Sequence, residues 1–158
     1  MRNDNQRWTP PTPLSRVGDG VTVTQVDVGG QVYVSGADVR DRFAGHLVAW
    51  PDVADGDTYV LSLRRDRVLL VGPTELKPGF ANGLAITDMS DAFDVIDLTG
   101  PKAVERLKTG GEIRFDQPSQ SVVRRLFGVE VMLCRLPRGG FRLHIPRTLS
   151  QAVVEVLG

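Results

Sequence analysis

The segment Ile86–Leu107, ITDMSDAFDVIDLTGPKAVERL, decides the fold, because it predicts two strands that lead directly into a helix. β-Branched and other apolar residues are concentrated in 86–90 and 93–98, and the polar Asp91 between them suits a tight turn. Pro101 is well placed in the first turn of a helix, where its missing N–H costs no intrahelical hydrogen bond. We therefore expect strand, strand and helix, with Ala103 and Leu107 on one helical face.

The same arrangement occurs earlier in the chain. Each of Val32, Ser35 and Gly36 has a counterpart 64 positions later, at Ile96, Thr99 and Gly100. In both copies a strand ends on a hydroxyl residue and a glycine, and a short helix follows. We expect a side chain at either glycine to crowd the turn or to strain the backbone. Two internal copies of one unit indicate a fold with pseudo-twofold symmetry.

The rest of the first half predicts strands in pairs. Two hairpins are expected, 21–28 with 31–35 through Gly29-Gly30, and 58–63 with 67–71. A helical turn is expected within 73–80. Residues 1–19 contain three prolines among polar residues, so they are expected to form an extended arm outside the folded core.

The second half repeats this order and ends in a helix. Strands are expected at 121–126, 129–136 and 141–145. The helix is expected to begin at Thr148 with a capping box to Gln151. Its apolar stripe would be Leu149, Ala152, Val153 and Val156.

These elements define the expected fold class and domains. Each half runs strand–strand–helix–strand–strand–helix, which predicts an α+β protein with antiparallel sheet and helices packed on one side. The folded domain is expected to span 20–158, with an internal duplication of about 20–83 and 84–158.

Composition excludes several classes of partner. The chain of 158 residues has 19 Lys and Arg against 19 Asp and Glu, so it lacks the basic excess that nucleic acid or anionic membranes require. No apolar run is long enough to cross a membrane, and the first residues lack the apolar core of a secretory signal. We expect a cytoplasmic protein, and its one cysteine, Cys134, excludes an internal disulfide.

The sequence contains no catalytic, cofactor-binding or metal-binding motif, so we expect none of these sites in this chain. His46 and His144 are far apart, and strand alternation places His144 on a polar, solvated face beside Arg142. Cys134 shares a strand face with Met132 and is interpreted as a small buried hydrophobe. A nucleophile would need a neighbouring base, which the local sequence does not supply.

Two groups of charged residues are candidates for other roles. The aspartates Asp88, Asp91, Asp94 and Asp97 are interpreted as a solvated sheet face and turn residues. Alternation along 121–126 puts either Arg124 or Arg125 on the core-facing side or at its rim. That arginine could pair with an aspartate of this chain or contact a partner protein, and the sequence leaves both open.

Two long segments resemble the γ subunit of heterotetrameric sarcosine oxidase. They are ITDMSDAFDVIDLTGPKAVERLKTG at 86–110 and SVVRRLFGVEVMLCRLPRGGFRLHIPRTLSQAVVEVL at 121–157. The earlier RDRVLLVGPTE, at 65–75, resembles that family's strand before a Gly-Pro turn, and TPPTPLSRVGDGVTV, at 9–23, its N-terminal arm. The family is similar in fold to the folate-binding domain of aminomethyltransferases, with duplicated ferredoxin-like halves.

The resemblance implies a structural role in a complex that oxidises an N-methyl amine and passes a one-carbon unit to tetrahydrofolate. It assigns FAD, FMN, NAD, zinc and tetrahydrofolate to the other subunits: the larger α and β subunits and a small zinc-binding δ subunit. For this chain we expect Trp8 and Leu14 of the N-terminal arm, together with Arg124 and Arg125, to contact a partner.

Two alternatives belong to other classes of protein. The first is a stand-alone folate-binding one-carbon transferase or repair protein of the same fold, in which Asp88 or Asp97 would face the pterin. The second is a protein-binding module unrelated to flavin enzymes, because a fold does not fix a function. The sequence does not identify the methylated substrate or the final electron acceptor.

Overall fold

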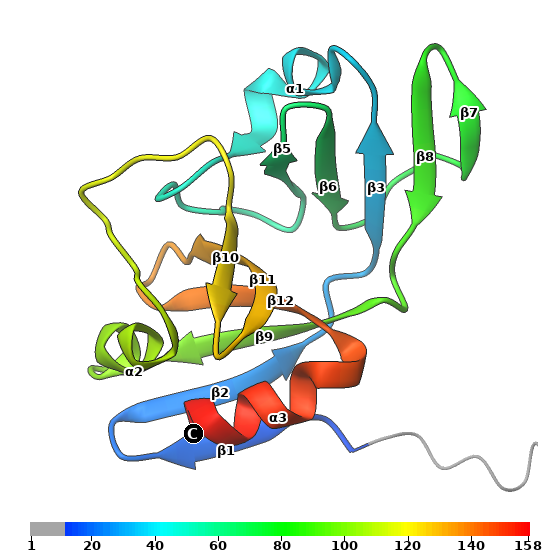
Figure 1. Cartoon of the computed structure of the whole chain (residues 1–158). Coiled ribbons are helices and arrows are strands. Elements are labelled where there is room, and N and C mark those ends of the chain that lie inside the picture. The colour runs from blue at the N-terminus through cyan, green and yellow to red at the C-terminus, as the bar shows by residue number, and fades with distance from the viewer. Residues whose placement is uncertain (1–11) are drawn as a thin grey trace, which may run out of the picture.

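A computed structural model describes residues 12–158 as two six-stranded sheets that pack face to face, with helices on the outer faces (Figure 1). The first sheet, sheet A, has the order β1 (Ser15–Gly18), β2 (Val21–Val26), β9 (Phe93–Thr99), β12 (Phe141–Pro146), β11 (Val129–Arg135), β10 (Val123–Leu126). The second sheet, sheet B, has the order β4 (Leu47–Val48), β5 (Tyr59–Arg64), β6 (Arg67–Val71), β3 (Gln31–Ser35), β8 (Leu84–Asp88), β7 (Gly79–Ala81).

Both sheets have the same strand order, which confirms the expected α+β fold with duplicated ferredoxin-like halves. When sheet B is taken from β7 to β4, its strands β7, β8, β3, β6, β5, β4 match β1, β2, β9, β12, β11, β10 of sheet A. The two copies exchange their first hairpin: β1–β2 pairs with β9 of the second copy, and β7–β8 pairs with β3 of the first. The exchange ties the halves into one domain.

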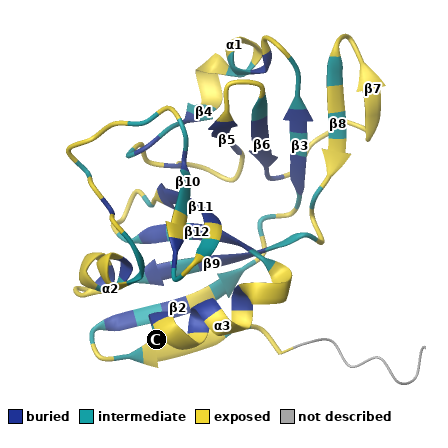
Figure 2. Cartoon of the chain, viewed as in Figure 1, coloured by how far each residue is buried: buried dark blue, intermediate teal, exposed yellow. Residues whose placement is uncertain are grey.

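The apolar residues form three clusters that follow these layers. A central cluster lies between the sheets and includes Leu61 and Leu69 from sheet B and Met132 from sheet A. An outer cluster on sheet A is covered by α2 (Ala103–Gly110) and α3 (Arg147–Leu157). A smaller outer cluster on sheet B is covered by α1 (Val39–Arg42). Figure 2 shows the buried residues concentrated in these layers.

One of the two expected hairpins is wrong, and the tight turn expected between 86–90 and 93–98 does not pair its strands. The strands at 21–28 and 31–35 are observed as β2 and β3, but they lie in different sheets, and the same is true of β8 and β9. Residues 27–30 and 89–92 therefore carry the chain from one sheet to the other. A pair of glycines such as Gly29-Gly30 predicts that the chain turns, but it does not specify which strands pair with each other. The hairpin of β5 with β6 is confirmed.

Three local boundaries differ from expectation. Residues 73–78 contain no helical turn and lead into β7. The last helix begins at Arg147, after Pro146, and no side chain caps it, so the capping box at Thr148 is wrong. Residues 15–18 of the expected arm form β1 and pair with β2.

The two predicted glycine junctions directly follow the equivalent strands β3 and β9, and each lies beside the turn of the exchanged hairpin. A Cβ atom on Gly100 would lie 2.4 Å from the carbonyl oxygen of Gly20, and one on Gly36 would lie 2.8 Å from that of Gly83. Gly100 also has a φ of 111°, which L-residues rarely adopt. The expected crowding is therefore present in both copies, and backbone strain is specific to Gly100.

Candidate functional site

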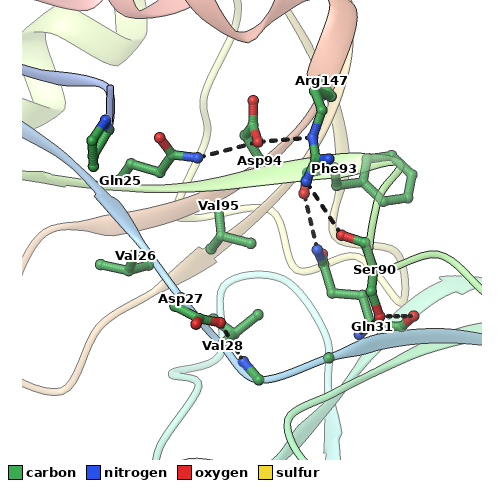
Figure 3. A pocket seen from close by; sticks show the side chains of 13 residues that line it. Gln25, Val26, Asp27, Val28, Gln31, Ser90, Phe93, Asp94, Val95 and Arg147 are labelled. Atoms are coloured by element: carbon green, nitrogen blue, oxygen red, sulfur yellow. Dashed lines mark hydrogen bonds and ion pairs between the residues drawn. The ribbon is translucent and has the colours of Figure 1, made fainter. Parts of the chain in front are cut away.

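The two segments that cross between the sheets meet beside each other and border a pocket of about 530 Å³. The N–H of Met89 donates to the Gln31 carbonyl at 2.8 Å, and the N–H of Gln31 donates to Ser90 Oγ at 3.1 Å. Figure 3 shows the pocket, whose polar lining comes from Gln25, Asp27, Gln31, Ser90, Asp94 and Arg147. The exchange of hairpins thus produces a polar site at the pseudo-twofold crossing.

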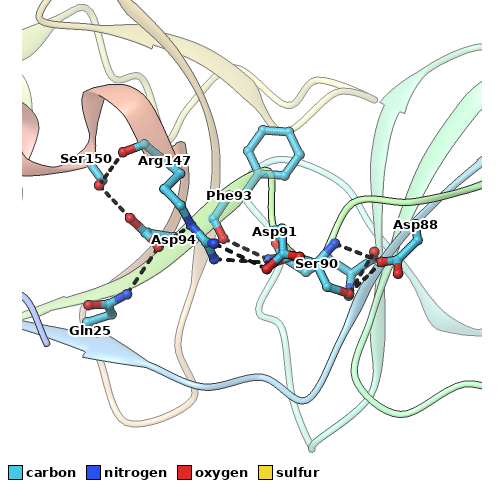
Figure 4. Close-up of polar contacts among 9 residues, drawn as sticks. Gln25, Asp88, Ser90, Asp91, Phe93, Asp94, Arg147 and Ser150 are labelled. Atoms are coloured by element: carbon cyan, nitrogen blue, oxygen red, sulfur yellow. Dashed lines mark hydrogen bonds and ion pairs between the residues drawn. The ribbon is translucent and has the colours of Figure 1, made fainter. Parts of the chain in front are cut away.

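Asp94, in β9, is the best-buried carboxylate in this part of the molecule, with 9% of the residue exposed. One oxygen, Oδ1, accepts hydrogen bonds from Gln25 Nε2 and Arg147 Nε, each at 3.2 Å. The other accepts from Ser150 Oγ in the first turn of α3 (Figure 4). A carboxylate at this position also interacts favourably with the positive end of the helix dipole. Asp94 therefore fastens α3 to β2 and β9.

Arg147 connects this buried carboxylate with an exposed one. Its Nη1 lies 3.2 Å from Oδ1 of Asp91, which is fully exposed, while its Nε holds Asp94. The charged groups of this pair of aspartates are thus already bound within the chain. The arrangement suits a structural clamp rather than proton transfer, because a general base needs an oxygen free to reach the substrate proton.

Asp88 and Ser90 order the second crossing. Asp88 Oδ1 accepts from the N–H of Ser90 at 2.9 Å and from its hydroxyl at 2.7 Å. These two hydrogen bonds stabilise the charged carboxylate and hold the pKa of Asp88 below its ordinary value. Ser90 in turn contacts the backbone of Gln31, so this turn joins β8 to the start of β3 (Figure 3).

His144, expected on a solvated face, is fully buried between the sheets. Its Nδ1 lies 2.6 Å from Gln31 Oε1, and its Nε2 lies 3.2 Å from the Tyr59 hydroxyl. Burial, with a smaller contribution from the charge of Arg142, lowers the pKa of His144 to about 3. The alternation argument failed because both faces of β12 are covered: one by sheet B and the other by α2 and α3.

Asp97, also expected on a solvated face, forms a bidentate ion pair with Arg142 of the adjacent strand. The Nε and Nη2 atoms of Arg142 donate to the two carboxylate oxygens at 2.7 and 2.8 Å. This hydrogen bonding raises the pKa of Arg142, and both side chains are mostly buried. The guanidinium also lies 3.5 Å from the hydroxyl of Tyr59, whose pKa is raised by burial. Both carboxylate oxygens of Asp97 are therefore already bound by Arg142.

Cys134 is buried, as expected, in the same cluster as Met132. Burial raises the pKa of its thiol to about 12. The thiolate that a nucleophile requires is therefore absent at neutral pH.

The four expected partner-contact residues are found in different environments. The Arg124 guanidinium stacks over Trp50 at 5.1 Å and donates to the carbonyl of Ser121, while Arg125 is exposed. Neither forms an ion pair with an aspartate of residues 12–158. Leu14 packs against the chain's own core on sheet A, and its N–H donates to Gln25 Oε1. Trp8 lies outside the described residues.

Within residues 12–158 no three His, Cys, Asp or Glu side chains are close enough together to hold a metal ion. None of the helices in the same range has the length and apolar character needed to cross a membrane. The site residue that sequence reasoning missed is Asp94. Its signal was present in the spacing of the aspartates, but only the fold brings Arg147, 53 positions later, to its carboxylate.

The fold is similar to that of solved structures, of which one example matches along most of the chain. It is a chain of "Heterotetrameric Sarcosine Oxidase from Corynebacterium sp. U-96 in complex with pyrrole 2-carboxylate", with 21% sequence identity and a TM-score of 0.63. The match covers 90% of this chain and 85% of that one. No protein-family model and no curated protein matches the sequence.

Proposed function

We propose that this chain is the small, structural γ subunit of a heterotetrameric, sarcosine oxidase-like flavoenzyme. The observation that carries the proposal is the structural match to a chain of such a complex, which extends over 90% of this chain. Because the match also covers 85% of the other chain, the two are of similar length, as expected for corresponding small subunits. The resemblance of 86–110 and 121–157 to the γ subunit is independent support.

The internal pairing of the polar residues supports a role without chemistry in this chain. The buried carboxylates Asp94 and Asp97 are both held by arginines of the same chain, and Cys134 is kept as a thiol. Within the proposed complex, oxidative demethylation of an N-methyl amino acid and transfer of the one-carbon unit to tetrahydrofolate take place on other subunits. Those subunits supply FAD, FMN, NAD, zinc and the folate site, and the complex works in the cytoplasm.

Purification of the tagged chain from its own cells tests this proposal. The expected result is a stoichiometric complex of four different chains that shows flavin absorption and converts sarcosine or a related N-methyl amine. The same chain produced alone is expected to be colourless and inactive toward these amines. A chain that purifies without partners and binds tetrahydrofolate would instead support the stand-alone transferase. Partners without flavin would contradict both enzymatic functions.

A further inference from the structure

The outer faces of the two sheets are covered unequally, although their strands are equivalent. On sheet A, α2 covers one part of the face, and α3 covers the β1–β2 hairpin through Val153, Val154 and Leu157. On sheet B, α1 provides Val39 over the part that corresponds to α2. No helix of the described residues lies over the β7–β8 hairpin, which projects from the edge of the sheet (Figure 1).

Strand register identifies the residues that α3 would contact in the second copy. Ile96 pairs with Gln25 in sheet A, and its counterpart Val32 pairs with Asp88 in sheet B. Ile86 and Leu84 therefore correspond to Val23 and Val21. The two valines are buried beneath α3, whereas Leu84 and Ile86 are only half-buried.

No part of the chain between residues 12 and 158 returns to this face. After β12 it forms the 11-residue helix α3, whereas after β6 it runs through 72–78 and enters β7 directly. No residue from 73 to 91 is buried, and Figure 2 shows the β7–β8 hairpin mostly exposed. On the outer face of β7, Gly79 pairs with Ile86 and Ala81 pairs with Leu84. These small residues leave room for a close approach, as Gly18 does beside the end of α3.

The charges at the two ends of this face are opposite in sign. Asp88 occupies the position of Gln25, which lies near the first turn of α3, and its lowered pKa keeps it charged. At the other end, Arg42 donates to the carbonyl of Asn82 in the β7–β8 turn. This turn corresponds to the end of β1–β2 where α3 finishes. A helix that lay as α3 does would place its positive end near Asp88 and its negative end near Arg42.

We propose that this outer face of β7–β8, formed by Gly79, Ala81, Leu84 and Ile86, is the docking site for one amphipathic helix of a larger subunit. The helix takes the place that α3 has on sheet A, with apolar residues on Leu84 and Ile86 and its N-terminus over Asp88. The inference rests on the proposed function and adds a site of assembly to it.

Paired alanines on opposite faces of the hairpin allow a matched test. Ala81 shares the docking face with Leu84, whereas Ala85 pairs with Phe80 and faces the other side. Both alanines are exposed, so Ala81→Arg and Ala85→Arg are expected to melt at the same temperature as the parent chain. Ala81→Arg is expected to raise the Kd for the flavin-bearing subunits at least about tenfold, and Ala85→Arg to leave it within about twofold.

A crosslink identifies the occupant independently. Because Cys134 is buried, Ala81→Cys introduces the one accessible thiol in residues 12–158, to which a bifunctional crosslinker can be attached. In the assembled complex, the expected product joins residue 81 to a helix of a larger subunit. Crosslinks to a second copy of the chain or to its own residues 1–11 would overturn the inference, as would equal effects of the two arginine variants. In each of these cases normal assembly of the parent chain would leave the proposed function intact, whereas a parent that binds no flavin-bearing chain would remove both.

Discussion

The half of the molecule built on sheet A and the half built on sheet B have the same strand order but different degrees of closure. Sheet A has a helix over each part of its outer face, and Val21 and Val23 of its exchanged hairpin are buried. Within residues 12–158 only α1 covers sheet B, and the equivalent residues of its hairpin, Leu84 and Ile86, remain half-exposed. The duplication thus explains why the two sheets have the same strand order. The covering of their outer faces differs because a helix, α3, follows β12, whereas β6 leads directly into β7.

The largest effect should come from the helix that closes sheet A. Leu157, the last residue of α3, is fully buried, so Leu157→Ala is expected to lower the free energy of unfolding by about 3 kcal/mol through lost contacts and a cavity. Leu149→Ala on the same helix is the control, because Leu149 is largely exposed and should change stability little. Chemical denaturation of both variants measures the difference. Equal losses would mean that α3 packs on another face.

Valine substitutions at the two glycine junctions are expected to lower stability by different amounts, and this difference should be slightly smaller than the previous one. Gly100→Val forces a side chain both into the Gly20 carbonyl and into a positive φ, and is expected to cost about 3 kcal/mol. Gly36→Val meets the Gly83 carbonyl and the end of the Leu84 side chain, which can move toward the uncovered face, but it has no positive φ to strain, so it should cost less. Thermal unfolding of the two variants gives the comparison. A larger loss at Gly36 would show that the β7–β8 hairpin is rigid.

The clamp on α3 has no counterpart in sheet B, where strand register places Gly30 at the position of Asp94. Asp94→Ala leaves Arg147, Ser150 and Gln25 without their shared acceptor, and is expected to cost about 2 kcal/mol. Asp91→Ala removes only the exposed partner of Arg147 and should leave stability nearly unchanged. Urea titrations distinguish the two, and similar losses would contradict the clamp.

The contact between the halves should make stability depend on pH. The pKa of His144 is about 3 in the folded chain and near 6.5 when unfolded, so the unfolded state binds the extra proton between these values. Stability is therefore present above about pH 6.5 and falls as the pH is lowered, by about 2 kcal/mol at pH 5. His144→Gln should remove this dependence whatever its effect at pH 7. If the stability of the variant falls with decreasing pH as steeply as that of the parent, the pH dependence arises from other groups.

The smallest effect concerns the uncovered hairpin. Ile86→Ala is expected to cost about 1 kcal/mol in the free chain, because Ile86 is only half-buried. Val23→Ala, at the equivalent buried position, should cost about 2 kcal/mol although it removes fewer carbon atoms. Denaturation of the free chain measures both losses. If Ile86→Ala proves the more destabilising, the outer face of β7–β8 is covered as fully as that of β1–β2.

The predictions that failed are those that depend on contacts between residues far apart in the sequence. The strands β5 and β6 were predictable because only a two-residue turn separates them. The stripe on α3 was not, since Leu149, Ala152, Val153 and Val156 satisfy helical spacing as well as the observed buried set of Ser150, Val153, Val154 and Leu157. Ser150 is buried where Asp94, from a strand 56 positions earlier, accepts a hydrogen bond from its hydroxyl.

By itself, the sequence determined the α+β class, the internal repeat, the crowded glycine junctions and the burial of Cys134, because each depends on local spacing or on residue type. Tertiary structure alone decided that the hairpins are exchanged, that His144 and Asp97 lie between the sheets, and that Asp94 meets Arg147. Strand periodicity specifies which residues share a face, but it does not specify what covers that face. In this protein both faces of the central strands are covered, so polar residues are buried wherever another strand or helix supplies their hydrogen-bond partners.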